Sequence, residues 1–220
     1  MIRRLIESGL DLPTFSVYDE DRTDPKTGCL ISFPTDQPAP VQFTKTHRIV
    51  DAQNTIPAIV ILRDGRDCLC SHAHYVRWCL QDEPELTVQQ ILTQLISGEV
   101  QSLPGGADVI AKWSWSKHVK AWAGRANTMY LRYEQVIAKN PQHTLMEICD
   151  HFNLLGYGIR SSGTVLHDFE SLQRVNAKFY RYGQAGSWGQ QMTPEAHDLF
   201  WTHHGDAMQM AGYPQEVLAL

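Results

Sequence analysis

The part of the sequence that decides the fold is the segment Ile59-Val60-Ile61-Leu62-Arg63-Asp64-Gly65-Arg66-Asp67-Cys68-Leu69-Cys70-Ser71. Its opening run of aliphatic residues is typical of a strand buried in a parallel sheet. The turn that follows leads into a helical pattern, so the segment predicts a strand–turn–helix unit. In open α/β sheets, ligands bind at the carboxyl ends of the strands, next to helix N-termini whose free N–H groups suit phosphate.

Arg63 stands at the end of this strand, and Ser71 follows about two turns into the helix. The two side chains are placed to hold one phosphate from two sides. Their spacing alone is equally compatible with a surface arginine and a serine on the outer face of an ordinary βα unit. The choice between the two interpretations depends on the rest of the chain.

The flanking sequence predicts strands that alternate with helices, and therefore an α/β domain with a mostly parallel sheet. We expect strands at residues 41–44, 58–62 and 129–133. We expect helices at residues 2–10, 67–80, 88–96, 109–122 and 194–211, and another that starts at Asn140-Pro141 and ends at Gly156. Residues 11–40 are rich in Pro, Asp and Thr and should be mostly loop. At 220 residues, the chain is long enough for one domain with a substantial core.

Three of these helices show apolar residues at helical spacing, which predicts their buried faces. The expected buried positions are Leu69, Ala73, Val76 and Leu80 in the first helix, Leu145, Ile148, Cys149 and Phe152 in the second, and Ala196, Leu199, Phe200, His203, Ala207 and Met210 in the last.

Composition excludes several classes of function. The formal net charge of −5 argues against a general nucleic-acid-binding protein, which needs clustered lysine and arginine. No apolar run is long enough for a membrane span, and residues 1–8 lack the apolar core of a secretory signal. The five cysteines are odd in number, which favours a reduced protein of the cytoplasm over a disulfide framework.

A zinc site is the first alternative to consider, because Cys68, Cys70, His72 and His74 lie close together in sequence. On a helix, residues two apart point to nearly opposite sides, so the four side chains cannot converge on one metal ion. We therefore expect no metal here.

Four separated segments carry residues suited to group transfer. They are Lys45-Thr46-His47 at a strand end, Arg63 with Ser71, Tyr133-Glu134 at the next strand end, and the glycine-punctuated basic loop Phe179-Tyr180-Arg181-Tyr182-Gly183-Gln184-Ala185-Gly186-Ser187-Trp188. On an extended segment, Lys45 and His47 point the same way. A histidine has a suitable pKa to accept a proton from an attacking hydroxyl, and a fixed lysine stabilises negative charge on a transferring group.

In this order and spacing, the four segments resemble the cytosolic-type sulfotransferases, whose donor is 3'-phosphoadenosine 5'-phosphosulfate (PAPS). The resemblance extends from about residue 41 to residue 213 and includes Trp115-Ser116-Lys117-His118-Val119 and Ala211-Gly212-Tyr213. It implies a three-layer α/β sandwich with a central, mostly parallel sheet, related to the P-loop nucleotide kinases. It also implies transfer of a sulfuryl group to a hydroxyl or an amine of a small-molecule or carbohydrate acceptor, without a metal ion.

The resemblance assigns a role to each candidate residue. It makes His47 the base and Lys45 the stabiliser of the transferring group. It places Tyr133 beside the adenine, and the 3'-phosphate of the donor between Arg63, Ser71, Arg181 and the backbone around Gly183. Tyr133 is also compatible with a packing residue at a strand end, and Gly183 with a glycine that only punctuates a surface loop.

The sequence departs from the family at its start. The strand and phosphate loop with which these enzymes begin have no counterpart between Met1 and Gly28, and residues 1–10 resemble the helix after that loop. We therefore expect one sulfotransferase-like domain over residues 1–220 that lacks this strand, either because the given sequence starts inside a longer enzyme or because the chain is a truncated product. As given, it would have an exposed sheet edge that favours self-association. Tyr182 and Ser187 also replace the lysine and aspartate that are common in the family.

Two other functions stay open. A degenerate domain would bind the 3'-phosphorylated adenine nucleotide, or a protein partner, without turnover. A phosphotransferase that uses ATP would need an acidic magnesium site, and the sequence shows no clear one.

Overall fold

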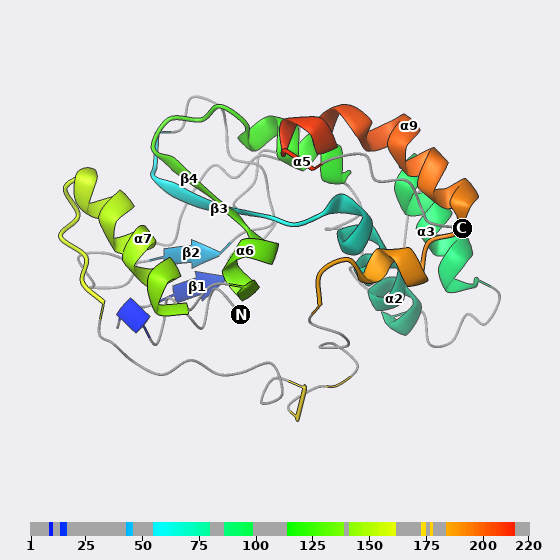
Figure 1. Ribbon diagram of the computed structural model, residues 1–220, viewed down its shortest axis with the longest axis horizontal. Helices are drawn as coiled ribbons and strands as arrows, with labels where there is room; N and C mark the ends of the chain where they lie inside the picture. The colour runs from blue at the N-terminus through cyan, green and yellow to red at the C-terminus, as the bar shows by residue number, and fades with distance from the viewer. Residues whose placement is uncertain are drawn as a thin grey trace. The chain divides into compact units, whose positions relative to one another are not determined.

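The computed structural model of the chain describes residues 9–10, 14–16, 43–45, 55–79, 86–98, 114–138, 141–161, 173–174, 177 and 184–213. The chain divides into two compact units, one made of residues 1–62 and 124–181 and the other of residues 63–123 and 182–220. The described strands belong to the first unit, whereas the described part of the second unit is helical (Figure 1).

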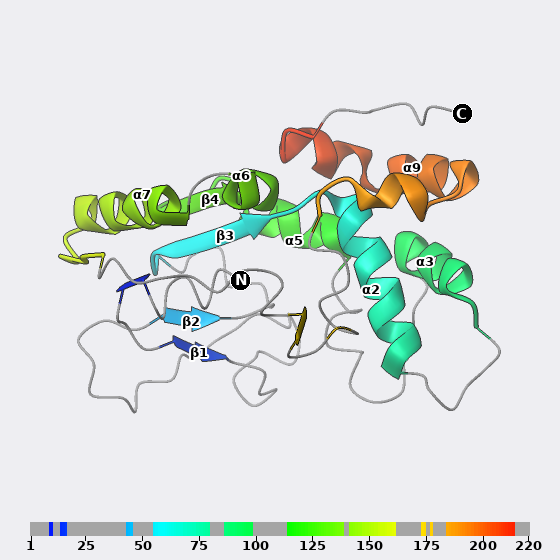
Figure 2. The same ribbon diagram turned by 60° about the horizontal axis from the view of Figure 1, so that its bottom comes forward.

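The strands of the first unit form two parallel pairs. In one pair, β3 (Ala58–Leu62) lies beside β4 (Thr128–Arg132), with Ala58 opposite Thr128 and Leu62 opposite Arg132 (Figure 2). In the other pair, β1 (Thr14–Ser16) lies beside β2 (Phe43–Lys45). The α/β class and the parallel pairing that the sequence predicted are therefore confirmed. The strand β1 was not predicted and lies in the stretch expected to be mostly loop, because three residues are too few for an alternating pattern to be recognised.

Helix α7 (Pro141–Leu154) supplies most of the core of this unit. The four residues predicted to be buried on it are buried: Leu145, Ile148, Cys149 and Phe152. They pack with Leu131 of β4. The ring of Phe152 meets that of Phe43 of β2 edge-on, with 5.3 Å between the ring centres. One helix thus packs against both strand pairs. Truncation of Ile148 to alanine would cost about 2–5 kcal/mol of stability at such a site.

Two boundaries differ from the sequence prediction. Tyr133, expected to end a strand, instead begins the short helix α6 (Tyr133–Ala138), whose first turn carries the acidic Glu134 favoured there by the helix dipole. The helix expected over residues 109–122 is described as α5 (Trp115–Trp122). It cannot run through Ser114, whose extended backbone lets its hydroxyl accept a hydrogen bond from the N–H of Lys117 at 3.3 Å.

The second unit is built around α2 (Gly65–Cys79), which contacts α3 (Val88–Ser97), α5, η3 (Ser187–Gln190) and α9 (Pro194–Met210). The predicted face of α2 is confirmed at Leu69, Ala73 and Val76, while Leu80 lies outside the described residues. Among the helices of the described residues, none is long and apolar enough to cross a membrane.

The buried face of α9 is rotated from the predicted one. Its buried residues are Ala196, His197, Phe200, His204, Ala207 and Met208, whereas His203 and Met210 are exposed. The reason is that two histidines have hydrogen-bond partners inside the unit and therefore occupy positions that an apolar pattern does not predict.

Candidate functional site

Arg63 follows β3 directly and precedes the first turn of α2. Its Nη2 donates a hydrogen bond to the carbonyl oxygen of Gln184 at 3.0 Å and lies 3.6 Å from Oδ2 of Asp67. The Arg63 side chain is 23% exposed, so its charge is anchored and still reaches the surface. Residues 121 positions apart in sequence are thus joined at the start of α2.

Asp67 holds the segment 184–188 against this helix end. Its Oδ2 accepts the N–H of Gly186 at 2.8 Å, and its Oδ1 accepts the N–H of Trp188 at 2.9 Å and the hydroxyl of Ser187 at 3.1 Å. The Asp67 side chain is fully buried. Hydrogen bonds to an ionised carboxylate are stronger than neutral ones, so this junction is a firm one.

The backbone of the segment is shaped for these bonds. Gly186 has φ +77°, a left-handed conformation that glycine adopts without steric cost. The serine at position 187, where the family commonly has aspartate, also fits locally. Its hydroxyl donates to Asp67, and a carboxylate would have no proton to donate there.

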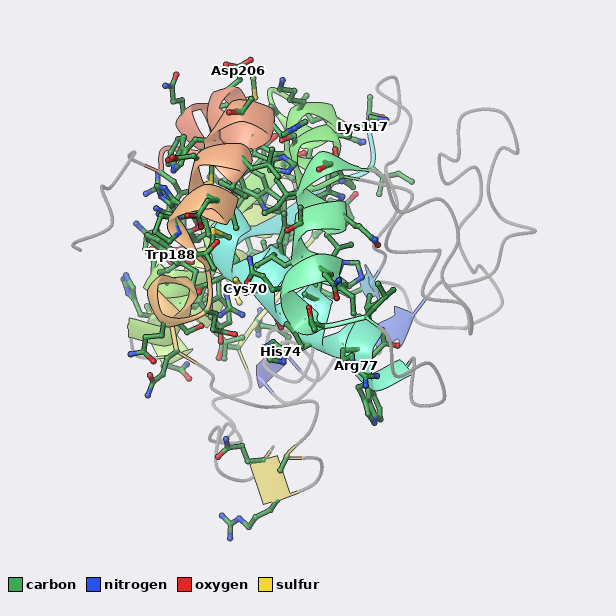
Figure 3. All side chains as sticks on the ribbon, turned by 90° about the vertical axis from the view of Figure 1, so that its right-hand side faces the viewer. Cys70, His74, Arg77, Lys117, Trp188 and Asp206 are labelled. Atoms are coloured by element: carbon green, nitrogen blue, oxygen red, sulfur yellow. The ribbon has the colours of Figure 1, made fainter. Side chains whose placement is uncertain are left out.

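Ser71 lies four residues after Asp67, one turn farther along the same side of α2. It is exposed. The side of α2 that carries Asp67 therefore also carries the Ser71 hydroxyl, which a ligand can reach. Figure 3 marks the course of the same helix by Cys70, His74 and Arg77.

The first turn of α2 is braced by a buried ion pair. Asp64 accepts the backbone N–H of Arg66 at 2.9 Å, and the carboxylate also meets the guanidinium, with Nη2 to Oδ2 at 2.7 Å. The guanidinium of Arg66 stacks over the indole ring of Trp188, 3.7 Å from its centre. Because Arg66 is 1% exposed, contacts such as these stabilise its charge in the interior.

Close packing fixes the position of this turn. A Cβ atom on Gly65 would lie 2.8 Å from the ring of Trp115 and 2.9 Å from that of Phe200, so any larger residue would force these rings to shift. The ring of Trp188, labelled in Figure 3, stacks on the imidazole of His197 with 5.4 Å between their centres. Aromatic side chains from α5, η3 and α9 thereby hold the helix end that carries the site.

A buried histidine ties three helices of this unit together. Nε2 of His204 on α9 lies 3.1 Å from the carbonyl oxygen of Ile96, and its Nδ1 is hydrogen-bonded to the hydroxyl of Ser116. A carbonyl only accepts, so Nε2 carries the proton and Ser116 donates to Nδ1. Burial lowers the pKa of His204 from 6.5 to about 4, which keeps the ring neutral in the folded protein at neutral pH.

The other predicted site residues are placed as follows. Lys45 ends β2, but its side chain lies outside the described residues, as do His47, Arg181 and Gly183. Tyr133 is partly buried and belongs to the other compact unit. Arg63 therefore meets the segment that directly follows Gly183, and the remaining assignments stay predictions. Within the described part of the chain, no group of three or more His, Cys, Asp or Glu side chains is arranged to hold a metal ion.

Sequence reasoning missed three residues that shape this region: Asp64, Arg66 and Asp67. A signal was present, because aspartate is favoured just before a helix and within its first turn. No local pattern indicates that Asp67 bonds a segment near position 187.

Comparison with known proteins agrees with this geometry. The parallel strands and the βα junction define the α/β class in which nucleotides bind at strand ends. Residues 34–212 match the Sulfotransferase domain, which is most of the chain, so the protein belongs to the sulfotransferase domain family. None of the curated proteins matches the sequence.

Solved structures share the fold at low sequence identity. A retinol dehydratase in complex with androsterone and the inactive cofactor PAP has a TM-score of 0.55 and 18% identity, with 83% of this chain and 57% of that chain covered. The mouse sulfotransferase SULT7A1 complexed with PAP has a TM-score of 0.54 and 17% identity, with coverage of 97% and 84%. Retinol dehydratase in a complex with retinol and PAP has a TM-score of 0.55 and 19% identity, with 80% of this chain and 55% of that chain covered. The chain thus spans little more than half of the two dehydratase chains, and the likeness shows the fold.

Proposed function

We propose that this protein is a sulfotransferase that moves a sulfuryl group from PAPS to a hydroxyl or an amine of a small-molecule or carbohydrate acceptor. One observation carries the proposal beyond family membership. The cation at the end of β3 is bonded to Gln184 of the predicted basic glycine loop, which supports a shared role for Arg63 and this loop in binding the phosphate.

The 3'-phosphate of the donor would be held by Arg63, Ser71, Arg181 and the backbone around Gly183. In support, Arg63 is partly exposed at a strand end, and Ser71 is exposed on the helix that follows. The N–H groups of Gly186 and Trp188 already bond to Asp67 and so do not serve the phosphate, which is consistent with backbone donors around Gly183. In a chain with a net charge of −5, a local cationic site of this kind is needed to bind an anion.

Catalysis would depend on His47 and Lys45. The donor supplies an activated sulfuryl group on a phosphate leaving group. His47 would take the proton of the acceptor hydroxyl as its oxygen bonds to sulfur, and Lys45 would stabilise the charge that develops on the oxygens of the transferring group. Support comes from β2, which ends at Lys45 and is anchored in the core through Phe43. Tyr133 would pack beside the adenine.

Similar structures suggest one acceptor class to include in the test. The two retinol dehydratase structures contain androsterone and retinol, both apolar alcohols. We therefore include apolar alcohols, beside phenols, amines and sugars, among the acceptors to be tested.

The test is transfer of radiolabelled sulfate from PAPS to a panel of these acceptors. We expect a labelled product from at least one acceptor class, and a loss of about 100-fold or more in rate for His47→Ala, because a general base contributes about 10²–10⁴-fold. His151→Ala is the matched control, since this histidine lies on α7 and has no proposed role. Tight binding of PAP, the desulfated product of PAPS, without transfer to any acceptor would favour the degenerate binding domain. Transfer from ATP with magnesium, and none from PAPS, would favour the phosphotransferase.

A further inference from the structure

The carboxylate of Asp67 is placed unusually for a phosphate site. A buried negative charge near the proposed 3'-phosphate would repel that phosphate unless it were neutralised. Two backbone N–H groups, one hydroxyl and the guanidinium of Arg63 surround the carboxylate. Its charge is thus matched inside the protein, and Asp67 binds protein groups instead of ligand.

These contacts link the two sides of the proposed phosphate grip. On one side Asp67 lies beside Arg63, and on the other it fixes three successive residues of the segment 184–188. Arg63 in turn bonds to Gln184, the first described residue of the same segment. The contacts form a closed ring: Arg63 to Gln184, along the chain to Gly186, and through Asp67 back to Arg63.

We propose that Asp67 is a positioning residue that sets Arg63 and the segment 184–188 in the geometry for the 3'-phosphate before nucleotide binds. This inference rests on the proposed function. Groups that are held in place before binding lose less entropy when the ligand arrives, so they bind it more tightly. Asp67 acts through Arg63 and the loop and does not contact the nucleotide.

Asp67→Asn is the sharpest substitution. Each carboxylate oxygen accepts one backbone N–H, from Trp188 at Oδ1 and from Gly186 at Oδ2. Replacement of either oxygen by an amide NH₂ turns one of these bonds into a contact between two donors, whichever way the amide is oriented. The volume of the side chain stays almost the same, so the change reports the bonding pattern.

The readout is the ratio of two affinities, for PAP and for adenosine 5'-phosphate, which lacks the 3'-phosphate. If Asp67 had a purely structural role, its substitution would weaken the binding of both ligands equally. If it has a positioning role, the substitution weakens the binding of PAP selectively. We expect the PAP preference of Asp67→Asn to fall at least about tenfold, as for the loss of one hydrogen bond to a charged group. Ser116→Ala is the matched control, because it removes a buried hydrogen bond from the same unit away from this ring and should leave the ratio unchanged.

The outcomes separate the two proposals. A wild-type protein with no preference for PAP overturns the proposed function, and this inference with it. A wild-type preference that Asp67→Asn retains overturns only the role of Asp67.

Amide hydrogen exchange of the wild type tests the inference even where Asp67→Asn does not fold. We expect the amides of Gly186 and Trp188 to be protected without nucleotide. Unprotected exchange without PAP, followed by protection when PAP is added, would show that the ligand forms the loop and would overturn pre-organisation by Asp67.

Discussion

The ion pair of Asp64 and Arg66 offers a quantitative test of how the site is held. Asp64→Asn keeps the helix cap, because asparagine caps as well as aspartate, and removes only the charge that faces the guanidinium. The two side chains are 10% and 2% exposed, so water cannot replace the lost partner. An uncompensated buried charge costs about 3–5 kcal/mol. We take the lower end, about 3 kcal/mol, because the stacking of Arg66 on Trp188 remains.

A second substitution shows whether the charge of Arg66, without the Asp64 carboxylate, causes the loss of stability. Arg66→Met in the same chain removes the guanidinium and fills most of its volume with an apolar side chain. The double variant should recover all but about 1 kcal/mol, the contribution of the lost cation–π contact.

Urea unfolding followed by circular dichroism measures these differences. With a slope of about 2 kcal/mol/M, Asp64→Asn should lower the midpoint by about 1.5 M. Asp198→Asn, at a side chain that is 89% exposed, is the control for the change of charge and should stay within about 0.5 kcal/mol of wild type. If the double variant is no more stable than Asp64→Asn, the charge of Arg66 does not cause the loss and the explanation is wrong.

Three further predictions concern the helical unit. The neutral His204 stabilises the fold fully above its unfolded pKa of 6.5, and this stability is lost as the pH falls toward about 4. In urea unfolding, acidification from pH 7 to 5 should therefore cost the wild type about 2 kcal/mol more than it costs His204→Gln. Equal losses in the two proteins would refute this explanation. Gly65→Ala should lose about 1–3 kcal/mol in thermal melts because the new Cβ meets two aromatic rings, whereas Gly189→Ala has open space and should be near neutral; equal melting points would contradict the packing argument. Ser71→Ala, at an exposed helix position, should weaken PAP about tenfold in a binding titration without lowering the melting temperature, and unchanged affinity would remove Ser71 from the site.

The sequence predicts those parts of the fold that depend on local pattern. The run 58–62 became a strand and the stripe Leu145, Ile148, Cys149 and Phe152 became a buried helix face, because periodicity and burial agree there. The face of α9 was predicted less well. The predicted face included His203, which is exposed, and omitted His197 and His204, which are buried because their hydrogen-bond partners come from tertiary structure.

The candidate site likewise has residues that the local sequence predicts and contacts that it does not predict. Arg63 and Ser71 could be found from the sequence, because a strand end and the following helix are local features. The junction made by Asp67 could not, since its partners are about 120 residues away and nothing in either segment specifies the other. The contact between Arg63 and Gln184 came close to the prediction only because the family resemblance already joined the two segments.

The most direct test of the central claim is calorimetric titration of PAP into wild type, Arg63→Gln and the control Arg160→Gln. Arg160 is also an arginine, exposed and without a proposed role. We predict that Arg63→Gln binds PAP at least about 30-fold more weakly, as for the loss of a charge-assisted contact to phosphate, while Arg160→Gln binds like wild type. Equal PAP affinity in all three proteins would contradict the claim that the end of β3 and the start of α2 form a 3'-phosphate site.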